Sequence, residues 1–155
     1  MTTWGEFGTA APDLAEHGRR LFYRTETGEA LLATVRGDGL PRIHPIYVAI
    51  LEGRLVAFIA ASAKATDLAT DGRYVLHNHQ DPAAPDEFQV RGRARPIEDE
   101  ATRARLAAAW YFDASEGYRL FEFLIDQALL GQRPGPEDWP PRYTSWISSG
   151  VRQKG

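Results

Sequence analysis

Two histidines, His77 and His79, have the spacing that most directly suggests metal chemistry in this chain. Side chains two residues apart on a β-strand lie on the same face, so both imidazoles could bind one metal ion. A zinc site needs further ligands, and no set of carboxylates accompanies the two histidines. We therefore interpret both as ordinary strand histidines and predict no metal site.

Other patterns that could support catalysis are missing or weak. The chain has no cysteine, which excludes disulfides, thiolate catalysis, iron–sulfur clusters and cysteine-type zinc sites. No G-x-S-x-G pattern marks a serine nucleophile. Arg91, Arg93 and Arg95 alternate along one stretch, where we expect a solvated face; the alternative is that they reach a phosphate across a dimer. No catalytic residue can be assigned from these patterns.

An anion is favoured at one place, the start of an Ala-rich segment. Ser62 is placed to cap a helix that would run to about Ala69, before Gly72. The first N–H groups of a helix have no partner within it and attract negative charge. The hydroxyl of Ser62 would lie among them.

Composition and charge limit the class of protein. The length of 155 residues indicates a single domain, residues 1–155. Eighteen Lys and Arg against twenty-one Asp and Glu give a net charge of −3, which makes nucleic acid a poor default partner. There is no signal-peptide pattern and no apolar run of about 20 residues, so we expect a cytoplasmic protein with no membrane partner. We expect core or dimer packing for Trp110, Trp139 and Trp146.

Strand patterns dominate the elements that would position these residues. Apolar and β-branched runs separated by Gly- or Pro-containing turns predict strands joined by hairpins. Strands are expected at 30–36, 41–51, 55–60, 73–79, 87–97 and 142–148, and helices at 12–23, 62–69 and 98–111. By pattern, the segment 119–130 fits a strand or a helix. An antiparallel barrel with helices on its outside fits this set best.

Several short motifs in a fixed order resemble the pyridoxamine 5′-phosphate oxidase-like family of FMN-binding split β-barrels. They are a strand ending in Asp-Gly, a P-R-x-x-P strand, a Ser-x-Lys turn, a D-G-R turn and a V-x-G-x-A strand. The resemblance covers roughly residues 12–130. It implies a mainly β fold, a six-stranded antiparallel split barrel with flanking helices, and it favours a strand at 119–130. It also implies a homodimer with two flavin sites at its interface.

The resemblance further assigns positions that contact the cofactor, FMN. Arg42 and Lys64 match positions where basic side chains hold the flavin phosphate, and Ser62 adds a hydroxyl. The plainer alternatives are a strand-edge charge for Arg42, a solvated cation for Lys64 and an outward-facing polar residue for His44. Glu87 stands near a position where relatives carry a cofactor-contacting Gln. The remaining implied contacts are Ile43, His44, Pro45, Ile46 and Tyr47, whose strand borders the isoalloxazine ring, and Ile59.

Departures from the family pattern keep the activity open. Ala63 replaces the Arg of a Ser-Arg-Lys signature, and Thr66 and Asp67 stand where many relatives carry a basic residue and Asn. The leading expectation is an FMN-dependent oxidoreductase acting on a small organic substrate, and not on vitamin B6. The alternatives are a deazaflavin-dependent reductase of the same fold and a non-catalytic flavin- or haem-binding module. The substrate pocket would be built by loops 80–86 and 131–141 and by the partner subunit.

Overall fold

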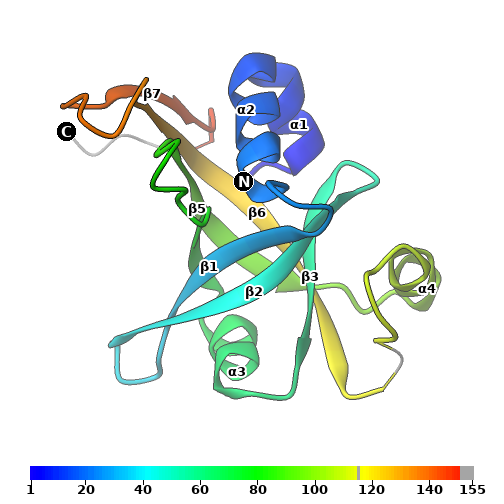
Figure 1. Ribbon diagram of the computed structural model, residues 1–155. Helices are drawn as coiled ribbons and strands as arrows, with labels where there is room; N and C mark the ends of the chain where they lie inside the picture. Colours follow the sequence, from blue (N-terminus) through cyan, green and yellow to red (C-terminus); the bar gives the residue numbers. More distant parts are fainter. Residues whose placement is uncertain (115, 151–155) are drawn as a thin grey trace.

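The computed structural model describes residues 1–114 and 116–150 (Figure 1). Its helices are α1 (Trp4–Ala10), α2 (Pro12–Phe22), α3 (Ala63–Thr70) and α4 (Glu100–Ala108). Its strands are β1 (Gly28–Val35), β2 (Pro41–Leu51), β3 (Arg54–Ala60), β4 (Arg73–His77), β5 (Glu87–Pro96), β6 (Tyr118–Gln132) and β7 (Arg142–Ile147). The expected mainly β fold is confirmed. None of the helices in these described ranges is both long and apolar enough to cross a membrane.

The strands from β1 to β6 close into an antiparallel barrel. Hydrogen-bonded neighbours follow the order β3-β2-β1-β4-β5-β6-β7, and an additional pairing of β3 with β6 closes the ring. β7 lies outside the ring and pairs with β6. The segment of ambiguous pattern is strand β6, which pairs with β3 on one edge and with β5 on the other. The predicted six-stranded antiparallel barrel is therefore confirmed.

The barrel wall is open along one seam, between β2 and β3. β2 pairs with β1 from Pro41 to Val48, but its pairing with β3 covers Ala49 to Leu51 alone. The first part of β2 and the last part of β3 therefore diverge toward α3 (Figure 1). Within the described residues, the β3-facing edge of 41–48 has no strand partner. We call this opening the split.

Helices cover the barrel around this opening. α1 and α2 form a hairpin over one end, α3 lies across the other end, and α4 stands beside β3 and β6 (Figure 1). At the hairpin end, the ring of Phe22 from α2 packs edge-on against that of Phe88 from β5, with centroids 5.3 Å apart. The indole of Trp4 lies 6.3 Å from both rings. This aromatic cluster holds the N-terminal hairpin on the barrel.

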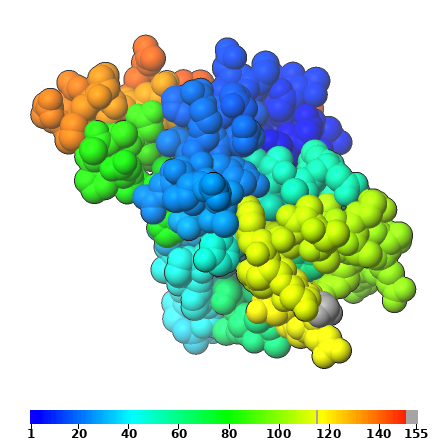
Figure 2. All heavy atoms as spheres, turned by 45° about the vertical axis from the view of Figure 1, so that its right-hand side comes forward, coloured from blue at the N-terminus to red at the C-terminus, as the bar shows by residue number. Residues whose placement is uncertain are grey.

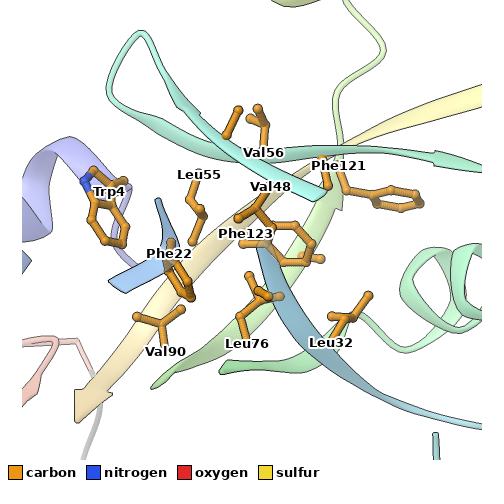
Figure 3. Close-up of a cluster of buried hydrophobic side chains, with 14 of the residues drawn as sticks. Trp4, Phe22, Leu32, Val48, Leu55, Val56, Leu76, Val90, Phe121 and Phe123 are labelled. Carbon is orange, nitrogen blue, oxygen red and sulfur yellow. The ribbon is translucent and has the colours of Figure 1, made fainter. Parts of the chain in front are cut away.

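The core follows the two-residue alternation of the strands. In β1, buried and half-buried residues alternate along the whole strand, so one face is turned into the barrel. Figure 3 shows side chains from β1, β2, β3, β4 and β6 converging on one centre. The fully buried phenylalanines are Phe7, Phe22, Phe88, Phe121 and Phe123.

Three elements differ from the sequence expectation. The sequence does not predict α1, because its segment contains two glycines. It forms because Thr3 caps it through a hydrogen bond from Glu6 N and because Trp4 and Phe7 are buried. α4 is shorter than 98–111, since Asp99 caps its start. β4 ends before His79, so the expectation that both histidines lie on one strand is wrong.

Core packing is confirmed for two of the three tryptophans. Trp110 is 8% exposed, with its ring 5.3 Å from that of Phe58, and Trp146 packs 5.0 Å from Phe7. Trp139 is 75% exposed and does not pack in the core of this chain.

The row of arginines on β5 is exposed, as expected for a solvated face. Its last member nevertheless has a structural role. The carboxylate of Glu122 on β6 is fully buried and accepts hydrogen bonds from Arg54 Nη1 at 3.0 Å and Arg95 Nη2 at 2.8 Å. This cross-strand pair of bonds ties β3 and β5 to β6.

Candidate functional site

The unpaired part of β2 forms one lip of the split. Side chains of Pro41, Ile43, Pro45 and Tyr47 are exposed, whereas those between them are half-buried. Proline has no N–H to give to a neighbouring strand, so Pro45 favours an edge here, as its position in the sequence indicates. The backbone groups of this lip are available to a ligand with a polar rim.

The start of α3 lies at the end of β3, beside the split. Ser62 caps the helix, as predicted: its hydroxyl accepts from Ala65 N at 3.3 Å and donates to Ala60 O at 2.8 Å. Among the described residues, the N–H groups of Ala63 and Lys64 have no hydrogen-bond partner. The half-buried Lys64 forms no ion pair within the same residues. This end of the helix therefore carries unused positive potential.

Arg42 reaches α3 from β2 and is held there by a buried carboxylate. Its Nε donates to Asp67 Oδ2 at 2.9 Å, and Thr34 Oγ1 donates to the same oxygen at 2.8 Å. The terminal nitrogens of Arg42 form no hydrogen bond with described residues. Burial acts to raise the pKa of Asp67, but the bonds from Thr34 and Arg42, with the charges of Arg42 and Arg36, outweigh it and lower this pKa. Asp67 is therefore ionised, and Arg42 is oriented but partly neutralised.

Three consecutive aromatic residues after α4, Trp110–Phe112, cross the split, and we call them the aromatic strap. Tyr111 Oη accepts from Gly28 N at 2.9 Å and donates to Val48 O at 2.7 Å. Burial first, and then a hydrogen bond with Tyr23, raise the pKa of Tyr111. Figure 2 shows the segment after α4 running along β2.

The ring contacts of the strap reach both sides of the opening. The Phe112 ring lies 6.3 Å from Tyr47 of β2, and the Trp110 ring lies 5.3 Å from Phe58 of β3. Phe112 and Tyr47 remain 39% and 46% exposed, so flat apolar surface is left at the mouth of the split. This role was not predicted, although the unbroken Trp-Tyr-Phe run after a helix is a visible signal in the sequence.

Two expected contacts lie deeper along the split. His44 is half-buried on the β2 lip, and its Nε2 is buried without a partner among the described residues. A buried ring nitrogen without a partner is suited to a ligand's hydrogen-bonding group. Ile59 is 3% exposed and pairs with Arg119 across β3 and β6. Its side chain belongs to the barrel core of this chain.

Glu87 lies apart from the split in the single chain. It belongs to β5, which β1 and β4 separate from β2. It lines a pocket of about 270 Å³ with His77, Gln89, Leu129 and Tyr143. A hydrogen bond to the Glu87 carboxylate, with some burial, raises the pKa of Tyr143. The structure therefore brings together Arg42, Ser62, Lys64 and the β2 lip, but not Glu87.

The outer sheet face carries two further features. His77 Nδ1 lies 2.6 Å from Asn78 O, and a carbonyl can only accept, so the proton is on Nδ1. A pocket of about 370 Å³ is lined by Glu29, Pro45, Ile46, Tyr47 and His79. Within the described residues, no group of three or more histidines or carboxylates is arranged to hold a metal ion.

The sequence of this chain matches a known protein family over most of its length. Residues 21–129 match the family model of pyridoxamine 5′-phosphate oxidase. The chain belongs to this family. No curated protein sequence matches it.

Solved structures with the same fold carry diverse names. A haem-binding protein from Mycobacterium smegmatis is 21% identical with a TM-score of 0.61, over 84% of this chain and 57% of that one. The present chain thus spans little more than half the length of the Mycobacterium smegmatis protein. A Clostridium acetobutylicum protein of the pyridoxinephosphate oxidase family is 12% identical with a TM-score of 0.66, over 88% and 94% of the two chains. The haem storage protein of Vibrio cholerae is 13% identical with a TM-score of 0.57, over 88% and 93%.

Proposed function

We propose that this protein binds FMN in the split of each subunit of a homodimer and acts as an FMN-dependent oxidoreductase on a small organic substrate. The observation that carries the proposal is the unpaired lip of β2 lying next to the unpartnered N-terminus of α3. The backbone groups of the β2 lip suit the polar edge of a flat ring, and the N-terminus of α3 suits a phosphate. Membership of the family supports the same choice.

The residues of the split fit such a cofactor. Lys64, the free N–H groups of α3 and the terminal nitrogens of Arg42 would bind the phosphate. Backbone groups of Ile43–Tyr47 and the unpartnered His44 Nε2 would meet the polar edges of the ring. Tyr47 and Phe112 would keep water from its face. When bound, FMN supplies hydride and electron transfer, so the protein's own part is to bind, orient and shield.

The outer surface of the barrel supports the proposed homodimer. Ile43 and Tyr47 of β2 are 65% and 46% exposed, and Tyr143 of β7 is 52% exposed. Apolar side chains left exposed on the outside of a barrel are typical of a surface that packs against another. In the assembly, Glu87 of the partner subunit would approach the split and complete the cofactor site.

Sedimentation of a charged variant tests the dimer. Ile43→Asp should shift the protein toward the monomer at micromolar concentration, because it buries a charge in the proposed interface. Leu40→Asp is the matched control: Leu40 is equally apolar and 55% exposed, but lies in the turn before β2. A parent protein that sediments as a monomer would refute the interface.

Native mass spectrometry of protein purified without added cofactor tests the function itself. The expected species holds two chains and two FMN molecules, with absorption near about 450 nm as is general for flavins. A deazaflavin mass, with absorption near about 420 nm, would instead identify the deazaflavin-dependent reductase. A dimer that binds neither cofactor, even when each is added, would overturn the proposal.

Haem binding is the second candidate, because of the geometry at His77. The proton on Nδ1 leaves the lone pair on Nε2, and a histidine whose Nδ1–H is held by a carbonyl is the usual form of a metal-ligating imidazole. Two structural neighbours are named for binding or storing haem. Titration with haemin should then give a Soret band that His77→Ala abolishes and His79→Ala preserves. An unchanged band in His77→Ala would exclude this residue as the ligand.

A further inference from the structure

The phosphate end of the split contains an anion among its cations. Lys64 and Asp67 are three residues apart on α3, which makes them neighbours on the helix surface. Asp67 also binds Arg42 at 2.9 Å, and its side chain is 7% exposed. The carboxylate therefore binds one of the two basic residues that would face a phosphate and lies about one helical turn from the other.

We propose that Asp67 tunes the charge preference of this site: it weakens the binding of a doubly charged phosphate monoester more than the binding of a singly charged phosphodiester. The inference rests on the proposed flavin site and specifies how strongly that site discriminates between phosphate monoesters and phosphodiesters. A negative charge next to the phosphate repels the ligand in proportion to the ligand's own charge. The repulsion energy from Asp67 is therefore twice as large for the dianion as for the monoanion.

Among the described residues, Arg42 is the cation that binds this carboxylate, and it neutralises the carboxylate only in part because it would also face the phosphate. The next cation along the hairpin, Arg36, is paired with Asp38 at 3.0 Å. Position 63, in the first turn of α3, is an exposed alanine. Asp67 keeps its charge because Thr34 and Arg42 both donate to it. The site thus has two cations and one anion against the two charges of an FMN phosphate.

A series of three flavins isolates the effect of charge. Riboflavin has no phosphate, riboflavin 4′,5′-cyclic phosphate carries one negative charge on a diester, and FMN carries nearly two. Asp67→Asn removes the charge but keeps the size and an oxygen that accepts from Arg42. By fluorescence titration, this variant should bind the cyclic phosphate about 3- to 10-fold more tightly and FMN about 10- to 100-fold more tightly. Riboflavin should be unchanged.

Asp71→Asn is the matched control, since Asp71 caps the opposite end of α3 and pairs with Arg73 at 2.7 Å. It should leave all three affinities within about twofold. Ala63→Arg adds a cation at the site without altering a buried residue, and should tighten FMN more than the cyclic phosphate.

The titrations distinguish failure of the inference about Asp67 from failure of the proposed flavin site. If the flavins bind but Asp67→Asn leaves FMN unchanged or weaker, Asp67 only positions Arg42 and the inference is wrong. If Asp67→Asn does not fold, Ala63→Arg provides the test. The inference is then overturned if Ala63→Arg does not tighten FMN more than the cyclic phosphate. If riboflavin and FMN bind neither parent nor variants, the proposed flavin site fails and takes this inference with it.

Discussion

Removing the ammonium of Lys64 is the sharpest test of the phosphate site. Lys64 lies in the first turn of α3 and forms no ion pair within the described residues, so its ammonium can bind a phosphate without first breaking one. A charge-assisted hydrogen bond to a bound phosphate contributes about 1.5 to 3 kcal/mol. Lys64→Ala should therefore weaken FMN by about 10- to 150-fold. Arg42 is less suitable, because its removal would leave Asp67 buried without its cation.

Fluorescence titration of FMN and riboflavin against parent and variant is the assay. Riboflavin lacks the phosphate, so its affinity should hardly change, whereas a general folding defect would weaken both ligands. Arg20→Ala is the matched control, since it removes one exposed cation from α2, which covers the opposite end of the barrel from α3. It should leave the affinity for both flavins unchanged. If Lys64→Ala binds FMN as tightly as the parent, Lys64 is a solvated surface cation and the phosphate assignment is wrong.

Three further predictions concern the fold that carries the site. Gly18→Ala should destabilise the protein by about 1 to 3 kcal/mol in urea unfolding, because a Cβ there would lie 2.3 Å from the buried Phe88 ring. Gly8→Ala is its control and should not destabilise the protein, because the atom nearest to a Cβ there would be 3.9 Å away. Tyr111→Phe should cost about 1 to 3 kcal/mol, because it removes both hydrogen bonds of the aromatic strap to the backbone; an unchanged urea midpoint would contradict this. Asp67 has a lowered pKa, so its stabilisation is present above the ordinary value of 3.8 and is lost as the pH falls through the lower folded value. Urea midpoints measured from about pH 5 to about pH 2 should fall less steeply in Asp67→Asn than in the parent.

Local sequence determined the strands and the start of α3. The hairpin β1–β2 follows from an apolar run broken by Gly37-Asp38-Gly39, and Ser62 caps α3 through its own neighbours. These features depend on residues close together in the chain, so their patterns are sufficient to predict them. The motif order over most of the chain also indicated the family, and with it the strand at β6.

Tertiary structure alone decided which distant side chains contact one another in and around the site. The Arg42–Asp67 ion pair joins β2 to α3, the aromatic strap joins the segment after α4 to β2, and Glu122 joins β6 to β3 and β5. In the sequence, Asp67 stands out as a departure from the family pattern, but nothing there indicates that it pairs with Arg42. Periodicity reports which face of an element a side chain occupies, and not which distant side chain it meets. The bond between Arg54 and Glu122, for example, forms where β3 pairs with β6, and the paired residues Val56 and Glu122 stand far apart in the chain.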